Sequence, residues 1–177
     1  MPQNGLIHVY YGNGKGKTTA ALGLALRAAG YGKNVVIVQF LKGWNCGEHK
    51  ILQKMSNVTL IRGKTIKNKF VCDMNDEEKQ ATKELQEKSL KKALDLVDKG
   101  QCDLLVLDEA ADAQNLGMLD AKSLEEIIYN KPKSLELVVT GRNPDPRLLK
   151  QADYATEMIK HKHPFDKGIT ARKGIEF

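Results

Sequence analysis

Short apolar runs, each the length of a buried strand, alternate along the chain with longer stretches that carry apolar residues at helical spacing. Most runs are rich in valine, isoleucine and leucine without polar alternation, which is typical of strands buried on both faces of a parallel sheet. They lie at residues 6–11, 35–41, 58–61, 104–107 and 135–139, and a last strand is expected at residues 155–159.

Three longer stretches are predicted to be helices, at residues 19–29, from Asn75 onward, and at residues 120–129. Asn75 is a favourable N-cap residue, and Glu78 follows three positions later as in a capping box. The predicted core-facing stripe of this second helix is Ala81, Leu85, Leu90, Ala93, Leu94 and Val97. Gly100 is expected to end it.

Strands that alternate with helices predict βαβ units, and hence a doubly wound, mostly parallel sheet with helices on both faces. The chain of 177 residues shows no internal repeat, low-complexity tract or linker, so residues 1–177 are interpreted as a single α/β domain. Ligands of such sheets bind outside the carboxyl ends of the strands. Polar residues at those ends are therefore the candidates for function.

The first strand runs into YYGNGKGKTTAALG, a glycine-rich loop followed by a helix. Glycines let backbone N–H groups close around oxygen atoms, and a helix N-terminus favours negative charge, so this loop predicts a phosphate site. The usual pattern G-x-x-x-x-G-K-[ST] is one residue short here. We interpret the domain as a P-loop (RecA-like) fold, with nucleotide-binding residues Gly12, Asn13, Gly14, Lys15, Gly16, Lys17, Thr18 and Thr19.

Within this loop, Lys17 is expected to reach the phosphates and Thr18 to offer its hydroxyl to Mg²⁺. Lys15 and Thr19 would add further donors. Asn13 is expected either to adopt a left-handed backbone conformation or to bond the ligand. The alternative, a glycine- and lysine-rich turn on a basic surface, is disfavoured by the strand and helix on either side.

Two other strand ends carry candidate groups. Asp108 and Glu109 follow the run LLVL, where P-loop proteins place an acid that helps to hold the metal ion, although an ordinary solvated turn is an alternative. Arg142, in VVTGRN, is expected to pair with phosphate oxygens or to stack on a base. A surface arginine in a turn is the alternative there.

Composition narrows the class of protein. Apolar residues make up 41% of the chain and no apolar run reaches membrane-spanning length, which indicates a globular protein without a membrane partner. Cys46, Cys72 and Cys102 are scattered, which argues against structural zinc and favours a reducing, cytoplasmic location. The net charge of +6 is interpreted as solvated lysines plus a phosphate site, with no nucleic-acid partner. His161 and His163 are interpreted as loop residues.

Five stretches occur in the order in which one enzyme family carries them: GNGKGKTTAALGLALRA, QFLKGWNCGE, LLVLDE, VVTGRNPDPRLLKQAD and KHPFDKGITARKGIEF. Together they resemble the P-loop ATP:corrinoid adenosyltransferases over residues 5–177. The resemblance implies that a cobalt(I) corrinoid attacks the 5′ carbon of ATP and triphosphate leaves, in adenosylcobalamin biosynthesis or salvage. It also implies Mg²⁺ or Mn²⁺, ATP lying in reverse along the loop, a homodimer, and a flavodoxin-type electron donor.

The resemblance assigns roles to individual residues. The catalytic candidates Lys15 and Lys17 would stabilise the charge that grows on the departing triphosphate, and no general base is required because cobalt(I) is already a strong nucleophile. The candidate metal ligands are Thr18, Asp108 and Glu109, with Asp108 acting directly or through water. Phe70 is expected to contact the corrinoid.

Three departures from the family's pattern concern the corrinoid more than ATP. Phe70 is retained from a Phe-x-Trp pair that holds the corrinoid, but Cys72 replaces the tryptophan and offers less aromatic contact. The chain begins almost at its first strand, so an N-terminal lid over a partner's site is expected to be missing. Residues 110–114 are more polar than the family's.

Other classes of function remain open on the sequence. A phosphotransferase or NTPase of another specificity fits the P-loop and the Asp108–Glu109 pair equally well, and would yield ADP instead of triphosphate. A nucleotide- or nucleic-acid-binding module without turnover fits the positive charge. A corrinoid-binding regulator of the same family that has lost turnover is a further alternative.

Overall fold

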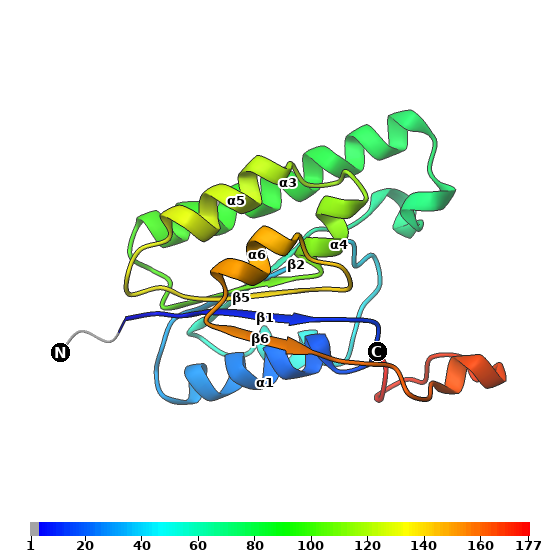
Figure 1. Cartoon of the computed structure of the whole chain (residues 1–177), viewed down its shortest axis with the longest axis horizontal. Helices are drawn as coiled ribbons and strands as arrows, with labels where there is room; N and C mark the ends of the chain where they lie inside the picture. Colours follow the sequence, from blue (N-terminus) through cyan, green and yellow to red (C-terminus); the bar gives the residue numbers. More distant parts are fainter. Residues whose placement is uncertain (1–3) are drawn as a thin grey trace.

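Six parallel strands form one sheet in the order β3-β2-β4-β5-β1-β6 in this computed structural model, which describes residues 4–177 (Figure 1). The strands are β1 (Ile7–Tyr11), β2 (Val35–Gln39), β3 (Val58–Arg62), β4 (Leu104–Asp108), β5 (Glu136–Gly141) and β6 (Tyr154–Glu157). The predicted parallel α/β sheet and its strands are confirmed, although β6 ends at Glu157 rather than Ile159. Residues 1–3, at the chain start where a lid was expected to be missing, lie outside the described residues.

Helices cover both faces of this sheet, as predicted (Figure 1). One face carries α1 (Lys17–Gly30) and the short α2 (His49–Leu52); the other carries α3 (Asp76–Asp98), α4 (Ala110–Asn115), α5 (Ala121–Asn130) and α6 (Pro146–Gln151). Three short 3₁₀ helices are η1 (Ile66–Asn68), η2 (Val71–Asp73) and η3 (Pro164–Lys167). Within residues 4–177, the structure contains no helix both long and apolar enough to cross a membrane.

The helix that follows the P-loop packs closely on the sheet through small side chains. Ala21, Ala25 and Ala29 recur at helical spacing and are buried against the strands. Because alanine side chains are short, the helix axis approaches the sheet closely, and its N-terminus is held at the carboxyl end of β1. The core therefore fixes the position of the loop before α1.

The long helix α3 begins with the predicted capping box. Asn75 Oδ1 accepts a hydrogen bond of 2.8 Å from the backbone N–H of Glu78, whose own carboxylate accepts one of 3.3 Å from the backbone N–H of Asn75. Lys67 and Lys69 both donate to the Glu78 carboxylate, and these hydrogen bonds lower its pKa to about 2. The helix start is thus tied to the segment that precedes it.

The predicted core stripe of α3 is correct only in its second half. Leu90, Ala93 and Val97 are buried, but Leu85 is 39% exposed, and the polar side chains of Thr82 and Gln86 are buried instead. The reason is that the first half of α3 covers a loop rather than the sheet. Thr82 Oγ1 accepts from the backbone of that loop, and Gln86 bonds the backbone on both its donor and acceptor sides.

Candidate active site

The glycine-rich loop is held between the ends of the two strands that flank β1, namely β5 and β6. Gly12 N donates to the carbonyl oxygen of Arg142, after β5, at 3.0 Å, and Gly14 N donates to that of Met158, after β6, at 2.6 Å. A Cβ on Gly12 would lie 2.5 Å from the Met158 carbonyl oxygen, and the φ of Gly12 is +99°. Only glycine meets both conditions, so the loop backbone is fixed before any ligand binds.

The amine of Lys17 lies across this loop. Its Nζ donates to the carbonyl oxygens of Gly12 and Gly14, at 2.7 and 2.9 Å. Burial lowers the pKa of Lys17, and the positive charge of Arg142 lowers it further. The loop therefore carries a preplaced positive charge, as expected for a phosphate site.

The other polar residues of the loop lie at the surface. Asn13, Lys15 and Thr19 are exposed. Asn13 does not adopt the left-handed conformation, so that alternative was wrong; its Oδ1 accepts from Lys160 N at 2.9 Å. This bond ties the loop to the C-terminal segment. In that segment His161 is exposed and His163 is half-buried, and both lie outside strands and α-helices, as predicted.

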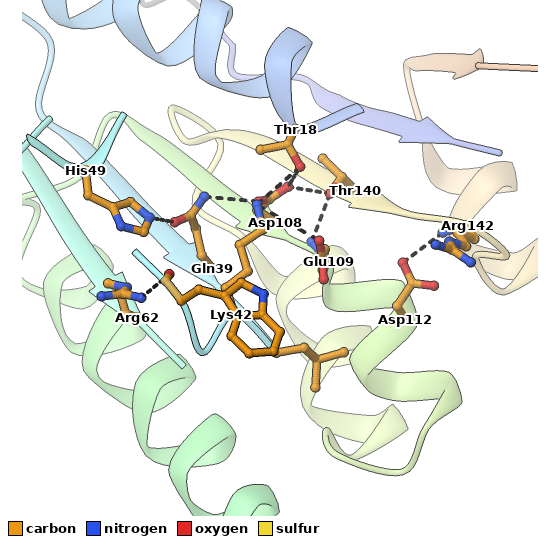
Figure 2. Close-up of polar contacts among 12 residues, drawn as sticks. Thr18, Gln39, Lys42, His49, Arg62, Asp108, Glu109, Asp112, Thr140 and Arg142 are labelled. Carbon is orange, nitrogen blue, oxygen red and sulfur yellow. Dashed lines mark hydrogen bonds and ion pairs between the residues drawn. The ribbon is translucent and has the colours of Figure 1, made fainter. Parts of the chain in front are cut away.

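A buried carboxylate forms the centre of the site. Asp108, the last residue of β4, is fully buried. Four side chains converge on it: Thr18 Oγ1 at 2.8 Å, Thr140 Oγ1 at 2.8 Å, Gln39 Nε2 at 3.2 Å and Lys42 Nζ at 2.7 Å (Figure 2). The expected meeting of Thr18 with the strand-end acid is therefore observed, and a solvated turn is excluded for Asp108.

The second acid, Glu109, sits beside this centre on a strained backbone. Its φ of 61° lies in the left-handed region, which non-glycine residues rarely adopt. Its backbone N–H donates to Thr140 Oγ1 at 2.9 Å, which holds the residue in this conformation. Burial raises the pKa of Glu109 to about 7, against the opposing effect of the Lys42 charge.

The donor set fits a divalent cation that prefers oxygen ligands. One hydroxyl, of Thr18, and two carboxylates, of Asp108 and Glu109, face a common point, and hard cations such as Mg²⁺ and Mn²⁺ favour such groups. The ammonium of Lys42 lies among the same three groups. The site is therefore built to hold positive charge.

Sequence reasoning missed the side chains that support Asp108 from β2 and from the segment after it. Gln39 ends an otherwise apolar strand, and that polar ending was the available signal. His49 Nε2 bonds Gln39 Oε1 at 2.7 Å, while His49 Nδ1 accepts from Cys46 N at 3.2 Å. Cys46, Glu48 and His49 lie within 4.8 Å of one another, but both nitrogens of this histidine are engaged in hydrogen bonds, so the cluster is not assigned to a metal.

Arg142 lies at the edge of the same site. Its side chain is exposed, and its backbone N–H donates to Asp112 Oδ2 at 3.0 Å (Figure 2). Asp112, which was not among the predicted site residues, has a pKa raised by burial. Arg142 is thus a surface arginine that also lies close enough to Lys17 to act on its charge.

Phe70 lies on the segment before α3, beside Trp44 from the segment after β2. Its ring meets that of Trp44 edge to face, with centroids 5.5 Å apart, and both side chains are largely exposed, at 64% and 49%. Arg62 secures the Trp44 segment by donating to Trp44 O and to Asn45 Oδ1. Cys72 lies exposed on η2.

Comparison with known proteins agrees with this geometry. The family model for ATP:corrinoid adenosyltransferase BtuR/CobO/CobP matches residues 3–177. The corrinoid adenosyltransferase of Pseudomonas aeruginosa is 34% identical over 99% of this chain and 85% of its own length. That of Escherichia coli K12 is 32% identical over 99% and 87%, and the corrinoid adenosyltransferase CobA of Salmonella typhimurium is 33% identical over the same shares.

These matches run from the first strand to the end of the chain, and they include the P-loop, the β4 acids and the C-terminal segment. The resemblance on which the residue assignments rest is therefore confirmed at the level of the family. The chain belongs to the ATP:corrinoid adenosyltransferase family of BtuR, CobO and CobP.

Proposed function

We propose that this protein transfers the 5′-deoxyadenosyl group of ATP to the cobalt(I) ion of a reduced corrinoid, in the biosynthesis or salvage of adenosylcobalamin. The observation that carries this proposal is the family match across residues 3–177. In the reaction, cobalt(I) supplies both electrons of the new cobalt–carbon bond and becomes cobalt(III). The bond between C5′ and oxygen breaks, and the triphosphate departs with that electron pair.

The loop residues are assigned to the leaving triphosphate. Backbone N–H groups of residues 12–19, with the amines of Lys15 and Lys17, would stabilise the negative charge that develops there. Support comes from the fixed positions of Gly12 and Gly14 and from the Lys17 amine already lying over the loop. Thr19 and Arg142 are assigned supplementary contacts with ATP.

Thr18, Asp108 and Glu109 are the residues that would hold Mg²⁺ or Mn²⁺, whose charge would further stabilise the leaving group. Their oxygen atoms suit such an ion, and Thr18 already bonds Asp108 at 2.8 Å. Deprotonated Glu109 would favour metal binding. Its elevated pKa therefore implies tighter metal binding as the pH rises through 7.

The corrinoid is assigned to the exposed aromatic pair. Phe70 and Trp44 present adjoining rings of low polarity, suited to the face of a large planar macrocycle. Trp44 would supply the aromatic contact with the corrinoid that Cys72 cannot supply. This assignment separates the two substrates: ATP at the P-loop, and the corrinoid at the segments after β2 and before α3.

The same proposal includes the oligomeric state, the cellular location and the electron donor. We take residues 1–177 as one catalytic domain that works as a homodimer in the cytoplasm and receives electrons from a flavodoxin-type donor. The free thiols of Cys46, Cys72 and Cys102 fit a reducing compartment. Size-exclusion chromatography with light scattering would test the dimer.

A second candidate function is ATP hydrolysis. Glu109 follows Asp108 directly and has a pKa near the working pH, which suits a general base that activates water. On this alternative the products would be ADP and phosphate.

The deciding experiment is anaerobic. Protein, ATP, Mg²⁺ and chemically reduced cobalamin are mixed, and phosphorus NMR identifies the phosphate product. Triphosphate in equal amount to a new cobalt–carbon bond supports adenosyl transfer, whereas ADP and phosphate contradict it. Lys17→Ala should abolish transfer while the fold is retained, and Lys33→Ala, which removes an exposed amine in the turn after α1, is the matched control.

A further inference from the structure

Lys42 is a half-buried lysine whose ammonium lies among the groups assigned to the metal. Its Nζ is 2.7 Å from Asp108 Oδ2, 3.5 Å from Thr18 Oγ1 and 4.0 Å from Glu109 Oε1 (Figure 2). The side chain is only 15% exposed, and the Asp108 charge raises its pKa in opposition to burial. At this degree of burial the ammonium has lost most of its hydrating water, and these contacts replace it.

Lys42 and a divalent cation compete for the same oxygen atoms. Asp108 and Glu109 together provide at most two negative charges, and the ammonium already neutralises part of them. A divalent ion entering beside the ammonium would place like charges a few ångströms apart in a poorly hydrated site, which is strongly unfavourable. One cation therefore has to leave for the other to bind.

We propose that Lys42 is a tethered cation that occupies the metal position in the nucleotide-free enzyme and moves to the triphosphate when the metal enters with ATP. This proposal rests on the proposed function, because it takes the P-loop and the β4 acids as the ATP and metal sites. Its consequence is an order of binding: the metal binds poorly alone and well together with ATP, whose phosphates receive the displaced ammonium.

The segment that carries Lys42 links this exchange to the aromatic pair. Leu41, immediately before it, has a left-handed φ of 59°, so the backbone is already bent sharply where the side chain departs. Trp44 lies two positions further on and contacts Phe70. Displacement of Lys42 is therefore transmitted to the surface assigned to the corrinoid, and ATP binding prepares that surface.

The test measures metal binding without turnover and without any corrinoid. Mn²⁺ is titrated into nucleotide-free protein and free Mn²⁺ is followed by electron paramagnetic resonance. Lys42→Met, which keeps the aliphatic stem and removes the charge, should bind Mn²⁺ at least about tenfold more tightly than the unsubstituted protein. Lys50→Met removes an exposed amine on α2 nearby and should leave the affinity unchanged. Equal affinities of folded Lys42→Met and the unsubstituted protein would overturn the proposal.

A second measurement needs no variant. Trp44 is the chain's single tryptophan, so its fluorescence reports on this segment alone. Mg²⁺ with ATP should change the emission, and Mg²⁺ alone should not; an equal change with Mg²⁺ alone would overturn the proposal. Equilibrium dialysis with ATP distinguishes failure of the proposed function from failure of the Lys42 proposal. If the protein does not bind ATP, the proposed function itself is contradicted. If it binds ATP but the Mn²⁺ affinities are unaltered, only the role of Lys42 is contradicted.

Discussion

Replacing Asp108 by asparagine tests the electrostatics of the site through stability. The two side chains have nearly the same shape, so packing is preserved and the change is one of charge. The asparagine NH₂ group can face the hydroxyls of Thr18 and Thr140, which are able to accept hydrogen bonds as well as donate them. The asparagine cannot neutralise the charge of Lys42, which then lies in the site without its nearest charged partner.

The size of the effect follows from that unpaired ammonium. Removing one partner of a buried ion pair typically costs about 3–5 kcal/mol of unfolding free energy. Lys42 keeps 15% exposure and a second acid, Glu109, at 4.0 Å, so we expect the lower end, about 3 kcal/mol. For a chain of this length that corresponds to a Tm lower by about 6–12 °C.

Urea unfolding followed by circular dichroism, without metal or ATP, measures this loss. Asp95→Asn is the matched control, because Asp95 is half exposed and, within residues 4–177, its one ion pair is with Lys91 at 3.6 Å. This substitution should change stability by less than about 0.5 kcal/mol. The double variant Asp108→Asn/Lys42→Met should recover at least half of the loss, since it leaves no unpaired ammonium beside the neutral asparagine. A single-variant loss below about 1 kcal/mol, or no recovery in the double variant, would refute the reasoning.

Three further predictions concern backbone, cap and pH. Gly14→Ala should lower Tm by several degrees and weaken ATP binding, since its Cβ would lie 2.7 Å from the Met158 carbonyl oxygen. Gly23→Ala should instead raise Tm by about 2–4 °C, because Gly23 lies within helix α1 and a Cβ there would meet no other atom. Asn75→Ala should cost about 0.5–2 kcal/mol in urea unfolding by removing the α3 cap. The folded-state pKa of Glu109, about 7, exceeds its unfolded value, so metal-free protein should lose stability as pH rises from 5 to 7, and Glu109→Gln should flatten that slope in thermal scans.

The sheet could be predicted because its central strands β2 and β4 are apolar on both faces. Runs such as Val35–Gln39 and Leu104–Asp108 are buried throughout, and no amphipathic helix of that length carries such a run. The capping box at Asn75 could also be predicted, because it depends only on residues three positions apart in the sequence. The short helices α2, α4 and α6 were not predicted, since none is long enough to show a helical period.

Long-range polar contacts were beyond the reach of the sequence. Leu85 looked like a core residue because periodicity assumes an apolar neighbour, but the first half of α3 lies over a loop that needs hydrogen-bond partners. Nothing in the sequence distinguished Lys42 from the other lysines. Only the fold brings it to Asp108, 66 positions away. The P-loop and the β4 acids could be named because each sits at a strand end. Of the groups that support them, only Gln39 gave such a signal, as the polar end of an apolar strand.

Convergence on Asp108 joins the two halves of the site. Thr18 connects this carboxylate to the P-loop, and Lys42 connects it to the segment that carries Trp44. A change at Asp108 should therefore weaken both ATP and corrinoid binding, whereas Phe70→Ala should affect the corrinoid alone, because the ring of Phe70 packs against Trp44. If Phe70→Ala weakened ATP binding as strongly as Asp108→Asn does, the separation of the two substrate surfaces would be wrong.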